Sequence, residues 1–346
     1  SFRANIDGNY KRFSYGINLS PSYSKSNRVN ASGSYGSEGV VQSALVSCPI
    51  WPVYNADGSF NYQGNGYWRI GNDYQHNEVL NPVALATLNK DEVERMALVG
   101  RIYAGFDFGY GFKFQTSFGG NYYGAQNDKY RPSTLPLLGK SYYDKASNPV
   151  GESSHGSYYN WLWENQLTWN KTIKDHSISA VLVQSAQKET YKGVSVKATD
   201  YPNDYIQTIT GGTVNAGSSK TTQWSLASYL ARVQYSWQGR YMFSAAIRAD
   251  GSSRFGKNNR WGYFPSASAA WRISDEAFMK KGKTFAWLDD AKVRFSYGQT
   301  GNFDIGNYEH LATMGVENYI LGSGAGSLAN GYKPNGVENP NLTWEK

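Results

Sequence analysis

The sequence predicts an all-β protein, folded as an antiparallel up-and-down β-barrel that crosses a membrane. Three observations support this fold class: apolar and polar residues alternate with period two, the connections are short and long in turn, and aromatic residues gather at segment ends. Such alternation gives a strand one apolar and one polar face. Short turns at one end and long loops at the other are the layout of a transmembrane barrel.

Ten segments carry the alternation. The clearest runs from Tyr229 to Trp237, where Tyr229, Val233 and Trp237 share one face and Arg232 and Gln234 share the other. It spans about 26 Å along the strand, or about 19 Å across a tilted bilayer crossing, close to the apolar band of such barrels. The expected strands are 1–10, 13–27, 96–107, 112–123, 157–170, 176–191, 224–237, 241–250, 262–273 and 291–300.

The connections between these strands differ sharply in length. The tight ones are 11–12, 108–111, 171–175 and 238–240, and the long ones are 28–95, 124–156, 192–223 and 301–341. The 251–261 connection is shorter than the other long loops. The 274–290 connection is longer than the other tight turns, and one helical turn is expected in it at 276–281. Trp169, Trp237 and Tyr241 flank tight turns, where a membrane interface favours amphipathic rings.

A soluble sandwich or propeller would show the same alternation. Propeller blades repeat at about 40–45 residues, and these connections are too uneven for that. A soluble sandwich is not expected to have all its short turns at one end of the strands and all its long loops at the other. The pattern therefore favours a membrane barrel over a soluble β fold.

The composition excludes several other classes. The 346 residues are enough for one large domain, and an aromatic content of 16% argues against disorder. No apolar run is long enough for a membrane helix, and the single Cys48 rules out a disulfide within the chain. The net charge of +7 comes from scattered residues, which argues against a nucleic-acid partner. Because the chain begins at Ser1, we expect a mature product or a fragment.

Catalytic motifs are missing from the sequence. The histidines lack metal-ligand spacing, so we expect each to be a polar loop or strand-end residue: His76, His155, His176 and His310. The G-x-G-x-x-A match at 324–329 lacks a βαβ context and predicts a flexible loop. Asp289 and Asp290 are adjacent, so their side chains should point apart, and Cys48 has no visible base. We expect no enzyme, no cofactor and no metal site.

Aromatic residues are unusually frequent in the long loops. Such rings can stack on sugars or grip peptides, or they can pack the loops onto one another over a barrel mouth. Both interpretations stay open, although rings at a pore entrance favour function. The candidate residues of a substrate path are Trp51, Tyr54, Tyr67, Trp68, Tyr142 and Tyr143, with Tyr62, Tyr74 and Tyr130 in the same loops.

Several blocks of sequence, taken in order, are specific. SYLARVQY stands at 228–235, RADGSSRFG at 248–256, VRFSYGQTGN at 293–302 and NPNLTWEK at 339–346. Shorter blocks lie at 55–60, 81–84, 264–267 and 270–273. In this order they resemble the SusC/RagA family of TonB-linked outer-membrane transporters of Bacteroidota. The resemblance covers nearly the whole chain and is most specific between 228 and 302.

The resemblance implies a closed barrel of about 22 strands around an N-terminal plug. It also implies import of glycans or oligopeptides, a SusD-like lipoprotein over the extracellular mouth, and a periplasmic TonB complex that pulls the plug. Residues 1–346 contain neither plug nor TonB box, so we expect a partial barrel domain whose open edges are completed elsewhere. A passive porin-like barrel and a soluble carbohydrate-binding β domain remain alternatives.

The polar face of the strand at 241–250 carries Arg248 and Asp250, two residues apart. A charge facing lipid costs about 2–4 kcal/mol near the midplane, so we expect both to face the lumen near its outer end. There they can pair with each other, with Arg232 and Arg272 of neighbouring strands, or with plug carboxylates. Residues 251–253 should form a tight turn that folds Arg254 over the rim. The pair is either a solvated surface ion pair or part of a cluster that fixes the inner wall against the plug.

Overall fold

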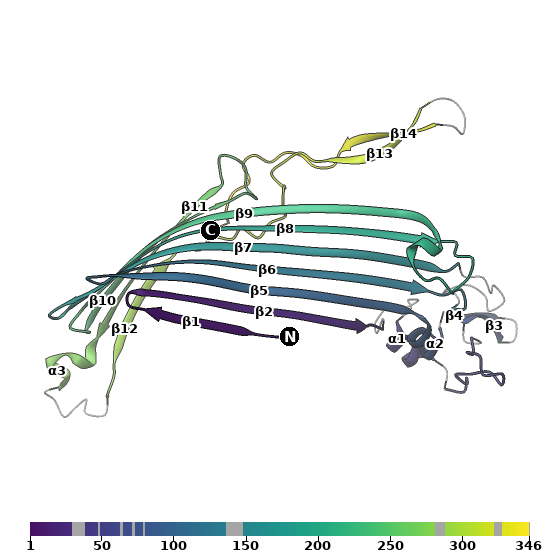
Figure 1. Ribbon diagram of the computed structural model, residues 1–346, viewed down its shortest axis with the longest axis horizontal. Helices are drawn as coiled ribbons and strands as arrows, with labels where there is room; N and C mark the ends of the chain where they lie inside the picture. The colour runs from purple at the N-terminus through teal and green to yellow at the C-terminus, as the bar shows by residue number, and fades with distance from the viewer. Residues whose placement is uncertain are drawn as a thin grey trace.

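Ten strands form one antiparallel sheet in which every strand pairs with its neighbour in sequence (Figure 1). The computed structural model describes residues 1–29, 39–47, 49–62, 65–70, 73–78, 80–135, 148–280, 288–321 and 327–345. The sheet order is β1-β2-β5-β6-β7-β8-β9-β10-β11-β12. Sequential pairing of this kind is an up-and-down meander, so the predicted antiparallel up-and-down arrangement is confirmed. The strands are β1 Ala4–Tyr10, β2 Phe13–Asn27, β5 Lys90–Gly109, β6 Phe112–Arg131, β7 Val150–Ile173, β8 His176–Thr199, β9 Thr213–Trp237, β10 Tyr241–Ser252, β11 Trp261–Arg272 and β12 Lys292–Gly298.

The central strands are much longer than the alternation predicts. β9 has 25 residues, or about 80 Å of extended chain, whereas the prediction began at residue 224. Its added part, 213–223, is rich in Ser, Thr, Gly and Asn on both faces, so period two is lost while the chain stays extended. The predicted long connections 124–156 and 192–223 are therefore wrong in length and shrink to 132–149 and 200–212.

The two faces of the sheet differ in polarity. The face here called the outer face carries Val233, Phe243, Ile247 and Phe295, each at least half exposed. The opposite, inner face carries Arg248 among many serines and amides. Among the described residues, no helix is both long and apolar enough to cross a bilayer. Exposed apolar rows of this extent mark a surface that contacts something other than water.

Tight turns join the strands at one end, called the short-turn end. Non-glycine residues with positive φ occupy these turns: Lys11, Tyr110, Lys174 and Gln238. The exception is the β11–β12 connection, which holds η2 Ile273–Asp275 and α3 Ala277–Lys280 and so contains the expected helical turn. Figure 1 shows α3 beside the turns at one end of the sheet and α1, α2, β3 and β4 near the other, called the long-loop end.

Gly111, in the β5–β6 turn, gives a testable prediction. Its φ is +91°, and a Cβ added there would lie 2.0 Å from the Asn170 carbonyl oxygen of the neighbouring strand. Gly111→Ala should therefore destabilise the barrel by roughly 2 kcal/mol, because the backbone must shift as well as bear strain. Gly239 also has positive φ but no atom within 4 Å, so Gly239→Asn is the control and should be tolerated. Thermal unfolding of the purified full-length protein measures both, and equal midpoints would contradict the steric account.

The first long connection is folded, which the sequence did not predict. It contains α1 Val40–Val46, the hairpin of β3 Asn65–Ile70 with β4 Asp73–Glu78, and α2 Pro82–Leu88. Asn81 caps α2 by accepting hydrogen bonds from the backbone N–H groups of Val83 and Ala84, as expected of an amide before Pro82. The connection packs around Leu80, Leu85 and Leu135, each at most 1% exposed.

The chain after β12 leaves the sheet and returns to it. β13 Met314–Leu321 and β14 Ser327–Pro334 form a hairpin that projects away from the sheet (Figure 1). Of the predicted flexible loop at 324–329, residues 324–326 lie outside the described residues, and residues 327–329 are not loop but the start of β14. The returning Glu345 pairs with Asn302 through a backbone hydrogen bond of 2.9 Å. The excursion therefore begins and ends at the same place beside β12.

Candidate functional site on the inner face

Three tyrosines form a row across the inner face, here called the tyrosine row. Tyr123 on β6 lies directly opposite Tyr158 on β7, which lies opposite Tyr191 on β8. The ring centroids are 6.4 Å apart for the first pair and 4.6 Å for the second. Tyr123 is 38% exposed and Tyr158 is 44% exposed. Because the rings meet in register, they present one continuous aromatic strip on this face.

A carboxylate with amide partners adjoins the tyrosine row and is called the Glu189 group. Trp224 Nε1 donates to Glu189 Oε1 at 3.0 Å, and Asn160 Nδ2 donates to Glu189 Oε2 at 3.1 Å. Gln187 Nε2 donates to Asn160 Oδ1 at 3.5 Å. Asn160 and Glu189 lie two residues along their strands from Tyr158 and Tyr191, on the same face. The arrangement thus combines flat rings with fixed polar groups.

Arg248 and Asp250 lie on the inner face and contact each other. Arg248 Nε donates to both carboxylate oxygens of Asp250 at 2.8 Å, and Arg248 Nη2 reaches Ser228 Oγ at 3.4 Å. Asp250 is 6% exposed, whereas the Arg248 side chain is half exposed. Since the guanidinium keeps one side open, it retains donors for a further anionic or polar group on the inner side.

Arg254 fixes the chain after β12 to the sheet. Its guanidinium donates to Asn307 Oδ1 at 2.9 Å, to the Phe303 carbonyl at 3.2 Å and to Asp304 Oδ1 at 3.1 Å. It lies over the rings of Trp224 and Phe303, at 5.1 and 5.4 Å from their centroids. The side chain is only 13% exposed. Arg254 thus acts as a latch between the β10–β11 loop and the segment 303–310.

Two expectations about the charged residues need correction. β10 continues through Ser252, whose backbone N–H bonds to the Arg260 carbonyl, so the turn is 253–260 and not 251–253. The charged residues expected on the lumen side also do not form one cluster; they are Arg232, Arg248, Asp250, Arg254 and Arg272. Arg272 ion-pairs with Asp275 and Asp290 at the short-turn end. It lies there because Trp271, the residue before it, pairs with Tyr241 at the start of β10, whereas Arg248 lies farther along β10. Arg232 is exposed on the inner face, opposite Ala246.

The predicted path residues lie partly outside the described side chains. Trp51 and Tyr54 belong to the folded first connection, where the Tyr54 ring packs 5.3 Å from that of Phe60. Tyr67 and Trp68 are part of β3, for which the backbone alone is described. Tyr142 and Tyr143 lie outside the described residues. Trp51, Tyr54, Tyr67 and Trp68 therefore share the connection between β2 and β5. Their role in a substrate path stays a prediction.

The described part of the chain holds no cluster of three histidine, cysteine or acidic side chains suited to a metal ion. His176 lies at the start of β8, with Nδ1 2.7 Å from the Tyr235 hydroxyl. His310 follows β12, with Nδ1 3.0 Å from the Arg254 carbonyl oxygen. Both positions are the polar strand-end and loop positions that the sequence predicts.

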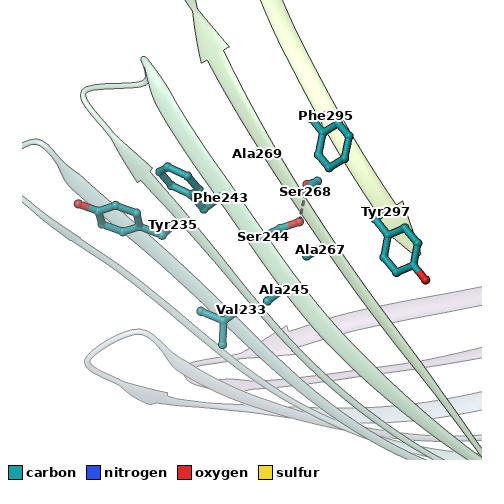
Figure 2. Close-up of a pocket in the computed structure, with 10 residues that line it drawn as sticks. All are labelled: Val233, Tyr235, Phe243, Ser244, Ala245, Ala267, Ser268, Ala269, Phe295 and Tyr297. Atoms are coloured by element: carbon teal, nitrogen blue, oxygen red, sulfur yellow. Dashed lines mark hydrogen bonds between the residues drawn. The ribbon is translucent and has the colours of Figure 1, made fainter. Parts of the chain in front are cut away.

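The outer face is built for an apolar environment. Trp237, Tyr241 and Trp271 stack side by side near the short-turn end, with interplanar angles of 23° and 8°. Figure 2 shows a hollow farther along this face, with Phe243 on one side and Phe295 on the other. Its lining is mostly apolar and includes Ala245, Ala267 and Ala269, and Ser244 and Ser268, which also border it, are hydrogen-bonded to each other. A band of alanines, aromatics and aliphatics that ends in stacked rings is the pattern of a lipid-facing surface.

Glu276 clamps the short-turn end. Its Oε1 accepts from the Tyr241 hydroxyl at 2.5 Å and from Trp271 Nε1 at 2.9 Å, and its Oε2 accepts from Arg240 Nη1 at 3.0 Å. The hydrogen bonds from Tyr241 and Trp271, together with the charge of Arg240, hold the pKa of Glu276 below its usual 4.5. One carboxylate thus ties the β9–β10 turn to the ends of β10 and β11.

The lowered pKa of Glu276 predicts a pH dependence. A depressed folded-state pKa stabilises the fold above the unfolded value and loses that effect as pH falls through the folded value. Between pH 7 and pH 3 the unfolding midpoint of the full-length protein should therefore fall less in Glu276→Gln than in the wild type. At pH 7 this variant should be the less stable of the two. The exposed Glu338→Gln is the control, and equal acid sensitivity in all three proteins would contradict the clamp.

Comparisons with known proteins agree with this architecture. The family model described as "TonB dependent receptor-like, beta-barrel" matches residues 1–346. TonB-dependent receptor P3 of Formosa agariphila is 32% identical over 97% of this chain, and TonB-dependent receptor SusC of Bacteroides thetaiotaomicron is 26% identical over 98%. The chain covers 32% and 35% of these two proteins, so it spans about a third of their length.

Solved structures share the fold. The structure titled "Structure of the RagAB peptide transporter" superposes with a TM-score of 0.78 at 18% identity, covering 99% of this chain and 36% of that one. The RagAB peptide importer in its 'open-open' state gives a TM-score of 0.77 at 20% identity, again over 99% of this chain and 36% of that one. At such identities the likeness concerns the fold alone.

The fold and the two-faced sheet define an outer-membrane β-barrel. The chain belongs to the TonB-dependent receptor β-barrel family, and its similarity to SusC and to the RagAB structures agrees with the resemblance that the sequence blocks carry. It is a protein of the bacterial outer membrane, and its family consists of TonB-dependent transporters and receptors, not enzymes. The outer face accordingly contacts lipid and the inner face lines the lumen. The short turns are periplasmic and the long loops extracellular.

Proposed function

We propose that this chain forms part of an active importer that carries glycans or oligopeptides across the outer membrane. The observation that supports it best is the inner face, where aromatic rings and polar groups are fixed together on a sheet whose opposite face is apolar nearer the short-turn end. A passive pore needs only a wet lumen, whereas stacked rings beside hydrogen-bonded amides suit recognition of a cargo. A soluble carbohydrate-binding domain would not expose the apolar outer face.

The proposal includes parts beyond residues 1–346. A plug and a TonB box would close and couple the barrel, a SusD-like lipoprotein would cover the extracellular mouth, and a TonB complex would supply the energy. Family membership supports these parts, as does the short length of this chain relative to its relatives. In this arrangement Arg248 and Asp250 would face the plug, where the open side of the guanidinium can take a carboxylate.

The proposal is tested by uptake in cells that carry the full-length gene. Accumulation of labelled glycan or peptide mixtures should require both a functional TonB and the proton gradient. Uptake that continues without TonB, or after the gradient is collapsed, would favour the porin-like alternative. Uptake that never depends on the gene would remove the import function altogether.

The loop aromatics give a second test of the same function. We propose that Trp51, Tyr54, Tyr67, Trp68, Tyr142 and Tyr143 lie along the cargo path at the extracellular end. Substituting Trp51, Tyr67 and Trp68 together by alanine should lower uptake of the true cargo and leave membrane assembly intact, because these residues belong to the first long connection and not to the ten-stranded sheet. Unchanged growth on every cargo that the transporter supports would count against this path.

A further inference from the structure

We propose that the tyrosine row and the Glu189 group form a binding subsite for the sugar rings of a neutral glycan on the inner wall. The inference rests on the proposed import function and names the class of cargo. The predicted path residues of the long loops take no part in it. The subsite is formed by Tyr123, Tyr158 and Tyr191 with Asn160 and Glu189, all from three adjacent strands.

Glycines let an aromatic ring lie against the wall. A Cβ at Gly193 would approach the Tyr191 hydroxyl oxygen to 2.5 Å, and one at Gly156 would approach it to 3.4 Å. The Tyr191 ring therefore lies along the sheet, in space that any side chain at Gly193 would fill. Tyr158 then packs on it at 41° and keeps nearly half of its surface exposed. Flat exposed rings suit the C–H faces of sugar rings, which offer apolar area without charge.

The polar part of the subsite matches hydroxyl groups. Each Glu189 carboxylate oxygen already accepts one protein hydrogen bond, and a carboxylate has about four acceptor sites in all. The remaining sites can accept from hydroxyl donors at about 7 Å from the tyrosine row, since two residues along a strand cover that distance. A negative charge at this position disfavours acidic glycans, which is why a neutral one is proposed.

The position in the sheet argues against an extended peptide as the ligand. Peptides commonly bind a β protein by adding a strand to a free edge. β6, β7 and β8 are each paired on both sides through the level of the tyrosine row, so no free edge exists there. A peptide would have to bind through side chains alone, whereas a glycan needs only ring faces and hydroxyl partners.

The structure supplies a matched control for the test. One residue along from Tyr123 and Tyr158, Tyr122 and Tyr159 form the same cross-strand pair on the outer face, with centroids 4.9 Å apart. The inner variant Tyr123→Ala/Tyr158→Ala and the outer variant Tyr122→Ala/Tyr159→Ala remove equal ring area from the same strands. A purely structural role would affect both variants alike.

The experiment uses the purified full-length transporter on an array of neutral and acidic oligosaccharides and on an array of decapeptides. The wild type and the outer variant should bind neutral oligosaccharides, and the inner variant should bind about 10-fold more weakly. Tyr123→Phe/Tyr158→Phe keeps the rings and should keep most of the binding. Binding of peptides alone, binding of no glycan, or equal losses in the inner and outer variants would each overturn the subsite.

The failure of this inference is distinguishable from failure of the proposed function. TonB-dependent uptake of peptides that is unaffected in the inner variant would overturn the glycan subsite and leave active import standing. Absence of any TonB-dependent uptake in the wild type would overturn import itself.

Discussion

Arg254→Ala is expected to release the segment 303–310 from the sheet. The substitution removes three hydrogen bonds and two cation–π contacts from a side chain that is only 13% exposed. Asp304 is 90% exposed and contributes little, so the loss comes mainly from Asn307, the Phe303 carbonyl and the two rings. We expect a local cost of roughly 3 kcal/mol, or about 100-fold faster amide exchange in this segment.

Hydrogen exchange by mass spectrometry on the full-length protein measures this release. The peptide that contains Asp304, Gly306 and Leu311, whose backbone N–H groups bond within residues 302–311, should lose protection. Arg254→Lys should rescue it only in part, because one ammonium cannot replace a planar guanidinium between two rings. Arg232→Ala, at an exposed inner-face position, is the control. Unchanged exchange after Arg254→Ala would show that the latch does not hold the segment.

Ala245→Arg is expected to impair assembly in the membrane. Ala245 lines the apolar hollow of the outer face, where an arginine would face acyl chains (Figure 2). A cationic side chain on the lipid face costs about 2–4 kcal/mol near the midplane. Ser244→Arg places the same side chain one residue away on the inner face, where it loses a 2.7 Å hydrogen bond to Ser268 but reaches water. The amount of heat-modifiable, folded protein in outer membranes compares the two, and equal amounts would contradict the assignment of faces.

The alternation predicted the sheet well where it faces lipid. Phe243, Ile247 and their neighbours repeat with period two because one face is in an apolar phase and the other in a polar one. Above the membrane both faces are polar, so 213–223 carries no period and its strand was not recognised. The hairpins β3–β4 and β13–β14 were missed because their short strands do not alternate regularly; in β13, for example, the apolar Tyr319, Ile320 and Leu321 are consecutive. The existence and order of the strands follow from the sequence, but their outer ends do not.

The inner-face site was predictable only where it depends on neighbours in sequence. Arg248 and Asp250 are two residues apart on one strand, so their shared face follows from the pleat. Tyr123, Tyr158 and Tyr191 come together only through the pairing register of three long strands, which the turns set. The sequence does hold one signal for this site: each of these tyrosines is an aromatic residue on the otherwise mostly polar face of its strand.

The assignment of one face of the sheet to lipid and of the other to the lumen can be tested position by position. Spin labels placed singly along β10, at each position from Met242 to Asp250 in a Cys48→Ser background of the full-length protein, test it in reconstituted outer-membrane lipid. Collisions with dissolved oxygen should dominate at Phe243, Ala245 and Ile247, and collisions with a water-soluble nickel chelate should dominate at the positions between them. A profile without period two, or with the two reagents exchanged, would contradict the assignment of the lipid-facing and lumen-facing sides.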